Sequence, residues 1–269
     1  MPLPRPSRQQ TADGPRVDTV AATARGSENI RRYQVCHERN VTIGPSQAED
    51  LWNFYSRFVD CSRDRFMSAI AQADELYQLR GPQNDLLGFA ALRTIEIQVD
   101  GERRRVLYVL YTDLEERLRG LAIVHRLAVG RYLRFRLRHP FLPTYVAFSA
   151  STAASYLSMA QSLQEYWPRP GRETPPEIKR IVEAALHRCG IEGWDPERGV
   201  LRRHGQLRYR DSGQSDVRPT AHAEFYRIRN PEQQYGDSLI CLFPVNCRNA
   251  LAAIRTMIRL ALRRNRANG

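Results

Sequence analysis

The chain almost lacks lysine. Of its 41 lysines and arginines, Lys179 is the only lysine, and the arginine surplus gives a formal net charge of +12 and a pI of about 10.0. A GC-rich coding sequence produces the same bias, because it favours Arg codons over Lys codons. The functional interpretation is an anionic partner, such as a phosphate-bearing cofactor, an acidic carrier protein, nucleic acid or a membrane surface.

Other absences exclude whole classes of protein. No apolar run approaches transmembrane length, and residues 1–28 lack the apolar core of a secretory signal, so by elimination we expect a cytoplasmic protein. The five cysteines have no paired metal-ligand spacing, which favours reduced thiols and predicts neither a metal site nor a covalently bound cofactor. No G-x-S-x-G, P-loop or H-E-x-x-H string is present, so serine hydrolases, P-loop NTPases and zincins are disfavoured.

The most informative stretch covers residues 103–168. An apolar strand pattern at residues 106–111 precedes a charged turn, and a helical pattern follows over residues 121–137. A second apolar run at residues 145–148 leads into another helix near Ser151. This order predicts a βαβ crossover with parallel strands and a helix packed on one face of the sheet.

The turn between the first strand and the first helix has a composition suited to phosphate. Arg117, Gly120 and Ala122 spell R-x-x-G-x-A where the helix begins. A helix start carries unpaired N–H groups and a partial positive charge, and small residues let a ligand reach them. Arg119 adds fixed charge. The alternative is an ordinary helix start with its arginines in solvent, which would have the same sequence. The predicted phosphate-binding residues are Arg117, Leu118, Arg119, Gly120, Leu121 and Ala122.

With its flanks, this region resembles the acyl-CoA-binding core of the GNAT (Gcn5-related N-acetyltransferase) superfamily, over roughly residues 30–168. In that family a Q/R-x-x-G-x-G/A turn follows the fourth strand and holds the pyrophosphate, and a splayed strand pair beside it takes the pantetheine arm. In that family a later helix carries a pattern of small residues that ends in a tyrosine. Here, Ala150, Ala153 and Tyr156 have similar spacing. The family's usual Asn is Ala150 here, and no Gly-Phe pair follows Tyr156.

The resemblance implies roles for particular side chains. Tyr156 is the candidate acid for the departing thiolate, with a core tyrosine as the plain alternative. Glu96, beside polar residues on a predicted strand, is the candidate base, with a solvent-facing strand residue as its alternative. The carboxylates of Asp113, Glu115 and Glu116 lie beside the predicted phosphate turn and would repel a pyrophosphate, so we do not expect them to bind it. One of them could face the amine instead.

We expect an α/β (α+β) fold with a GNAT-like mixed central sheet flanked by helices. Residues 1–28, poor in large apolar side chains, predict a flexible tail, and residues 29–168 form the GNAT-like core. Residues 169–269 predict a smaller C-terminal α/β extension with strands at 223–229 and 238–245. It ends in a basic amphipathic helix.

Two functional hypotheses follow. The first is a GNAT-like N-acyltransferase that moves an acyl group from acyl-CoA, or from acyl-phosphopantetheine on an acidic acyl carrier protein, to an amine. Arg131, Arg134 and Arg138, on one helical face, are candidates for docking such a carrier. The second is a non-catalytic basic adaptor for nucleic acid or an anionic surface, or a degenerate GNAT-like scaffold. The acceptor amine is not apparent from the sequence.

Overall fold

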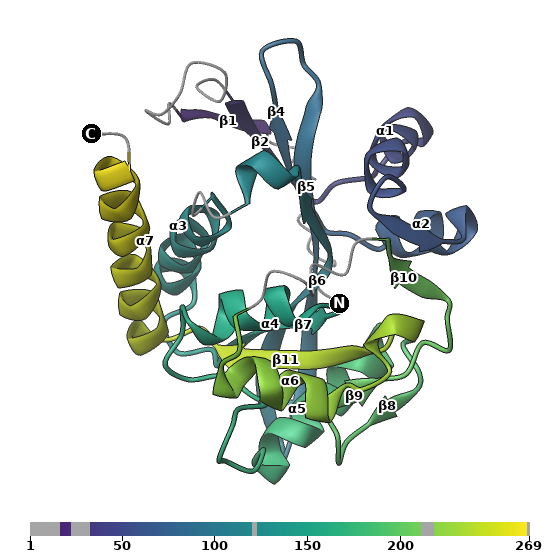
Figure 1. Ribbon diagram of the computed structural model, residues 1–269, viewed down its shortest axis with the longest axis vertical. Coiled ribbons are helices and arrows are strands. Elements are labelled where there is room, and N and C mark those ends of the chain that lie inside the picture. Colours follow the sequence, from purple (N-terminus) through teal and green to yellow (C-terminus); the bar gives the residue numbers. More distant parts are fainter. Residues whose placement is uncertain (1–16, 23–32, 120–122, 211–217, 268–269) are drawn as a thin grey trace, which may run out of the picture.

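The computed structural model describes residues 17–22, 33–119, 123–210 and 218–267 (Figure 1). Their strands are β1 (Val17–Ala22), β2 (Tyr33–Arg39), β3 (Val59–Cys61), β4 (Glu75–Arg80), β5 (Leu86–Val99), β6 (Glu102–Leu114), β7 (Thr144–Ala150), β8 (Trp194–Asp195), β9 (Val200–Leu201), β10 (Leu207–Tyr209) and β11 (Ser238–Pro244). Their helices are α1 (Pro45–Tyr55), α2 (Arg63–Ile70), η1 (Glu116–Leu118), α3 (Ile123–Arg138), α4 (Ala153–Ala160), α5 (Pro176–Arg188), α6 (Ala221–Arg229), η3 (Gln233–Tyr235) and α7 (Cys247–Ala267).

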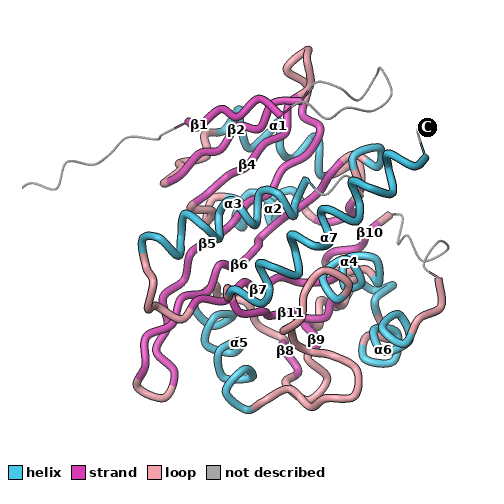
Figure 2. The backbone as a smooth tube through the Cα atoms, turned by 90° about the vertical axis from the view of Figure 1, so that its left-hand side faces the viewer, coloured by secondary structure: helices cyan, strands magenta, loops and turns pink. Residues whose placement is uncertain are grey.

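Within the described residues, nine strands form one mixed sheet in the order β1-β2-β4-β5-β6-β7-β11-β9-β8. Seen nearly edge-on in Figure 1, α3 and α7 lie on one side of β5 and β6, and α1 and α2 lie on the other. Figure 2 shows the strands fanning behind α3 and α7. The expected fold class, a mixed sheet flanked by helices, is confirmed. None of the described helices is long and apolar enough to cross a membrane.

The predicted βαβ crossover is confirmed. Strand β6 pairs parallel to β7, from Arg105 opposite Thr144 to Val109 opposite Phe148, and α3 forms the connection. The neighbouring pairs β2–β4, β4–β5 and β5–β6 are antiparallel. The GNAT resemblance implies a strand, two helices, an antiparallel meander and then β-α-β-α. The described elements follow this order, so the chain is GNAT-like in topology.

A β-bulge interrupts β6 at Leu110. Strand β5 pairs Ala91 with Tyr111 and Leu92 with Val109, which leaves Leu110 as an extra residue. One inserted residue reverses the alternation of side chains beyond it and bends the strand. Tyr111 therefore packs in the core under α1 and α2. Without the bulge, it would face α3.

The apolar core has a separate cluster for each group of helices. On one face of the sheet, the odd-numbered residues of β5 from Phe89 onward face two clusters in turn. Phe89 and Ala91 pack under α1 and α2, while Ile95 and Ile97 pack under α5. The two clusters share Leu110, so α1, α2 and α5 cover the same face. The opposite face, which carries Thr94 and Leu107, lies under α3.

The residues after Pro176 add strands to the same sheet. Strand β11 pairs antiparallel with β7 over Leu239–Pro244, and α5 packs on β5 and β11. Whether residues 169–269 fold as a separate unit stays a prediction. Of the expected tail over residues 1–28, residues 17–22 are described, and they form β1, antiparallel to β2.

The strand predicted at residues 223–229 is wrong, because this segment is helix α6. The side chain of Thr220 caps the helix by accepting a hydrogen bond from the Ala223 N–H. Ala223 and Tyr226 are buried three residues apart, which is a helical spacing. The aromatic pair Phe225-Tyr226 resembles a strand in sequence, but the cap and the spacing determine the structure.

Candidate functional site

The candidate site lies where β6 and β7 separate. Their pairing ends at Val109 opposite Phe148, one residue before the bulge, yet β6 continues to Leu114 and β7 continues to Ala150. A bulge bends its strand, so the two parallel strands diverge beyond this point. Within the described residues, β7 does not pair with residues 110–114 of β6.

Asp113 is the ionisable group that the bulge places on the α1/α2 face. It is only 7% exposed, and the Tyr209 hydroxyl donates a hydrogen bond to its Oδ2 at 3.4 Å. Arg119 lies 3.9 Å from its other oxygen. Burial raises the pKa of Asp113 to about 7, against the opposing effects of Arg119 and Tyr209. A carboxyl that loses its proton near pH 7 is suited to act as a general base.

Tyr209 comes from a part of the chain 96 residues beyond Asp113. It lies on β10, which pairs antiparallel with β3 between α1 and α2. The turn at Gly236 holds β10 in place by close packing, because a Cβ on Gly236 would lie 1.7 Å from the Leu207 carbonyl oxygen. The C-terminal segment thus closes over the α1/α2 face beside Asp113.

A second set of polar side chains lies at the same end of β7. Ser149 Oγ is 3.2 Å from the Tyr108 hydroxyl and accepts a hydrogen bond from Arg203 Nη2 at 3.4 Å. Nε of Arg203 is buried and has no hydrogen-bond partner among the described residues. An unpartnered guanidinium N–H beside two hydroxyls is suited to bind an oxygen atom of a substrate.

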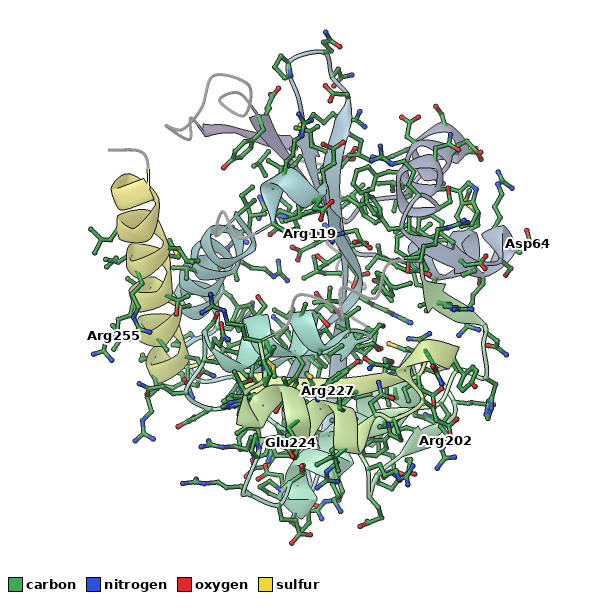
Figure 3. The ribbon with its side chains drawn as sticks, viewed as in Figure 1. Asp64, Arg119, Arg202, Glu224, Arg227 and Arg255 are labelled. Carbon is green, nitrogen blue, oxygen red and sulfur yellow. The ribbon has the colours of Figure 1, made fainter. Side chains whose placement is uncertain are left out.

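The predicted phosphate turn is described only in part, since Gly120, Leu121 and Ala122 lie outside the described residues. Arg117 is exposed and donates to Glu115 at 2.7 Å, while Leu118 is buried in the core under α3. Arg119, labelled in Figure 3, donates to the Leu114 carbonyl at 3.2 Å and lies over the Phe58 ring. Both guanidiniums therefore lie at the end of β6, next to the divergence from β7.

The structure places Glu96 away from this region. Glu96 lies on β5, where it pairs with Arg105 of β6 on the α3 face of the sheet. Arg105 and Asp113 lie at opposite ends of β6. Hydrogen bonds from Arg105 and Arg103 hold the pKa of Glu96 below its usual value. A carboxylate held by two guanidiniums accepts a proton less readily. Its assignment as the base stays a prediction.

Tyr156 is fully buried in the cluster between α4, α6 and β11. Its hydroxyl donates to the Pro168 carbonyl at 3.0 Å, and burial raises its pKa. The described hydrogen bonds and ion pairs join Tyr156 to neither Glu96 nor Arg117. The hydroxyl of the neighbouring Tyr226 donates to the carbonyl of Ala150, the last residue of β7, at 3.0 Å. The acid role of Tyr156 stays a prediction.

Sequence reasoning missed Tyr209, Arg203 and Ser149. Tyr209 and Arg203 lie in an arginine-rich, irregular stretch, and no local pattern points from it to β6. Asp113 was among the candidates, but the face it occupies depends on the bulge at Leu110. The run of β-branched and aromatic residues around Leu110 carries no glycine or other bulge signal.

No protein-family model matches the chain, and no curated protein matches it in sequence. Similar solved structures include Arabidopsis thaliana NAA60 in complex with a bisubstrate analogue, at 17% identity and a TM-score of 0.34, covering 49% of this chain and 86% of that one. The Escherichia coli GNAT family N-acetyltransferase YhbS in complex with CoA matches at 13% identity and a TM-score of 0.32, covering 60% and 79%.

A conserved protein from Enterococcus faecalis, described as a probable N-acyltransferase, matches at 10% identity and a TM-score of 0.36 over 52% of this chain. This chain spans 37% of the length of that protein.

Proposed function

We propose that this protein is a GNAT-like N-acyltransferase, which transfers an acyl group from a CoA-type thioester to an amine. The observation that carries the proposal is the divergence of β6 from β7 at a bulge, with a buried carboxyl of pKa about 7 just beyond it. Parallel strands that separate leave a slot for an extended ligand between them. The carboxyl supplies the proton acceptor that amine acylation requires.

In this proposal Asp113 takes a proton from the acceptor amine on the α1/α2 face. The amine nitrogen then attacks the thioester carbonyl, so that a C–N bond forms and the C–S bond breaks. The negative charge on the carbonyl oxygen is stabilised by β6 main-chain N–H groups beyond Val109, which β7 does not pair. The departing thiolate takes a proton from Tyr156, as the family resemblance implies, or from water.

The donor is proposed to enter from the η1–α3 side, with its phosphates near Arg117 and Arg119. Free acyl-CoA fits better than a carrier protein. Arg131, one of three arginines proposed to dock a carrier, is turned inward and pairs with Glu75. Its side chain is 16% exposed, so the strip would present fewer charges to an acidic helix than the sequence suggests.

The donor site is tested by titrating CoA into the Gly120→Glu variant. A carboxylate at the predicted phosphate turn is expected to weaken CoA binding at least about tenfold, by charge repulsion and loss of space. The control is Gly130→Glu within α3, where an added Cβ meets nothing within 4 Å. Calorimetry on both variants measures the affinities. Equal affinity in the two variants would remove the phosphate turn from the proposal.

A second candidate function, attachment to an anionic membrane surface, is favoured by α7. Leu251, Ile258 and Leu262 are 54%, 54% and 57% exposed and lie on one face of the helix. Arg255 lies on the same face, between Leu251 and Ile258, and Arg259 lies beside that face. Both arginines are exposed, and Figure 3 shows Arg255 on the outer side of α7. An exposed apolar stripe bordered by arginines matches the chemistry of an acidic bilayer surface.

This second candidate predicts binding to vesicles that contain phosphatidylserine. Replacing Ile258 with Asp is expected to lower that binding at least about fivefold, since it adds an anion to the apolar stripe. Ile228→Asp is the matched control, because Ile228 is 70% exposed on α6, away from the stripe. Co-sedimentation with phosphatidylserine and with pure phosphatidylcholine vesicles measures the effect. Equal binding by wild type and Ile258→Asp, or a preference for duplex DNA, would contradict the membrane assignment.

A further inference from the structure

A cavity of about 160 Å³ lies beneath the second half of α3, on the face of the sheet opposite Asp113. Strands β2, β4, β5 and β6 form its floor, and α3 with the residue after it forms its roof. The side chains that matter for its chemistry are those of His37, Glu75, Arg105, Arg131, Phe135 and Arg138. A volume of this size is several times what a single bound water requires.

Buried polar atoms without partners line this cavity. Among the described residues, Nδ1 of His37, Nε of Arg105 and Nε of Arg131 are buried and have no hydrogen-bond partner. His37 is 5% exposed. Both guanidinium Nε atoms carry a proton to donate, and a buried donor left unpaired is costly, so such groups are normally satisfied. A ligand rich in acceptor oxygens would satisfy these two guanidinium N–H groups.

The orientation of His37 is fixed. Its ring stacks on Tyr77 with centroids 4.0 Å apart and planes 8° apart, and its Nε2 lies 3.2 Å from the Glu75 carboxylate. Arg131 also donates to Glu75. Burial opposes ionisation of Glu75, but His37 and Arg131 outweigh it and lower the pKa of the carboxyl. Glu75 is therefore an anion that holds both residues in place and leaves Nδ1 of His37 as the unpaired ring nitrogen.

The charge around the cavity is positive. Arg105 pairs with Glu96 and Arg131 pairs with Glu75, so these two guanidiniums are balanced. Arg138 is exposed at the rim and has no carboxylate partner among the described residues. The guanidinium of Arg138 at the rim therefore favours an anion.

This cavity is separate from the proposed donor site. Arg131 follows Ile123, the first residue of α3, by eight positions, which corresponds to about 12 Å along the helix axis. The cavity faces α3, whereas Asp113 and Tyr209 face α1 and α2. A ligand here would therefore touch neither the reacting groups nor the predicted phosphate turn.

We infer that the cavity beneath α3 binds the oxyanion group, phosphate or carboxylate, of a small molecule. The N–H donors of Arg105 and Arg131 contact its oxygens, and Arg138 covers it from the rim. Phe135, which lies 5.1 Å from the Arg105 guanidinium, provides an apolar wall for the carbon part of the ligand. The site joins α3 to β2, β4 and β6, so its occupancy stabilises the docking of the helix on the sheet.

The experiment uses the full chain, with the ring nitrogens of its six histidines observed by NMR. Inorganic phosphate and acetate are titrated separately at constant ionic strength, and a His37→Gln variant assigns the His37 signal. We expect saturable shifts of that signal with at least one of the two anions. A shift with phosphate alone indicates a phosphate-bearing ligand, and a shift with acetate alone indicates a carboxylate ligand. A shift with both anions supports an oxyanion site in general.

Arg138→Gln is expected to lower the affinity for the anion at least about fivefold, because one charge-assisted contact is lost. Since Arg138 is exposed, the substitution leaves the fold intact. Arg227→Gln removes one exposed arginine from α6 and is expected to change nothing. The Gly120→Glu variant is expected to keep the His37 response, which separates this site from the donor site. Absence of a saturable His37 shift with either anion, or equal affinity in Arg138→Gln and wild type, would overturn the inference.

Discussion

Replacing Asp113 with Asn is expected to lower the rate of acyl transfer at pH 7.5 at least about 100-fold, while the affinity for CoA stays unchanged. Asn keeps the size of the side chain and can still accept from Tyr209, which lies 3.4 Å from Asp113 Oδ2. It cannot take a proton from the amine. Release of free CoA thiol from acyl-CoA, measured with a panel of amines, gives the rate.

The pH dependence follows from the buried position of Asp113. Its carboxyl acts as a base only when ionised, and its pKa is raised to about 7. The transfer rate of the wild type is therefore expected to rise between pH 5 and 8 with a midpoint near this pKa, and then to level off. The residual rate of Asp113→Asn is expected to lack this midpoint.

The same pKa makes an independent prediction about stability. A carboxyl with a pKa of 3.8 when unfolded and about 7 when folded binds its proton more tightly in the folded state. Its favourable contribution is complete below pH 3.8 and is lost as the pH rises through 7. Because Asn cannot ionise, the melting temperature of Asp113→Asn should rise relative to wild type across this interval.

Glu116→Gln is the control, since Glu116 is an exposed carboxylate in the adjoining turn. It should leave both the rate and the pH profile unchanged. If Asp113→Asn retains the rate and the pH midpoint of the wild type, Asp113 is not the base. Loss of rate in Glu116→Gln as well would indicate a general effect of charge near the turn.

Gly236→Ala is expected to cause the largest loss of stability, about 3 kcal/mol or more in the free energy of unfolding. Gly236 has a φ of +92°, where a side chain is strained, and its Cβ would lie 1.7 Å from the Leu207 carbonyl oxygen. The main chain of β10 must therefore move. For a protein of this size, the melting temperature should fall by roughly 6 °C or more.

Gly205→Ala is the matched control. Its φ is +77°, also in the left-handed region, but an added Cβ meets nothing within 4 Å. It should lose only the conformational cost, about 1 kcal/mol. Chemical denaturation of both variants gives the difference. Equal losses would mean that close packing against Leu207 does not hold β10.

Gly236→Ala also links stability to the site. Strand β10 carries Tyr209, and displacement of β10 removes the hydroxyl that donates to Asp113. Without that donor, the pKa of Asp113 should rise further, because hydrogen bonding to the ionised form lowers it. At a temperature where the variant stays folded, the midpoint of its pH–rate profile should move to higher pH.

Much of the fold could be predicted from the sequence, since the signals were local. Alternating apolar residues specify β5, the Asp100-Gly101 pair specifies the turn into β6, and the apolar spacing in α5 gives the helix with Ile181 and Val182 buried. Hydrophobic periodicity and turn chemistry act within about ten residues, so a single sequence exposes them. Helix α6 was missed because its capping residue, Thr220, was not recognised.

The candidate site could be predicted less well. The sequence identified the end of β6 as the place where chemistry is concentrated, with Arg117 and Asp113 both among its candidates. It gave no indication that Asp113 faces α1 and α2, because the extra residue at Leu110 becomes visible only when β5 is aligned beside β6. It also gave no indication that Arg203 and Tyr209 close over that end, or that Glu75 holds His37 and Arg131 together.

The sequence by itself determined the basic charge and the order of strands and helices through residue 168. These depend on composition and on neighbours along the chain. Only the tertiary structure decided which carboxyl is buried with a raised pKa, which arginines are paired, and where an arginine-lined cavity forms. These properties depend on the solvent access and charges that distant segments bring together, and no local pattern encodes such contacts.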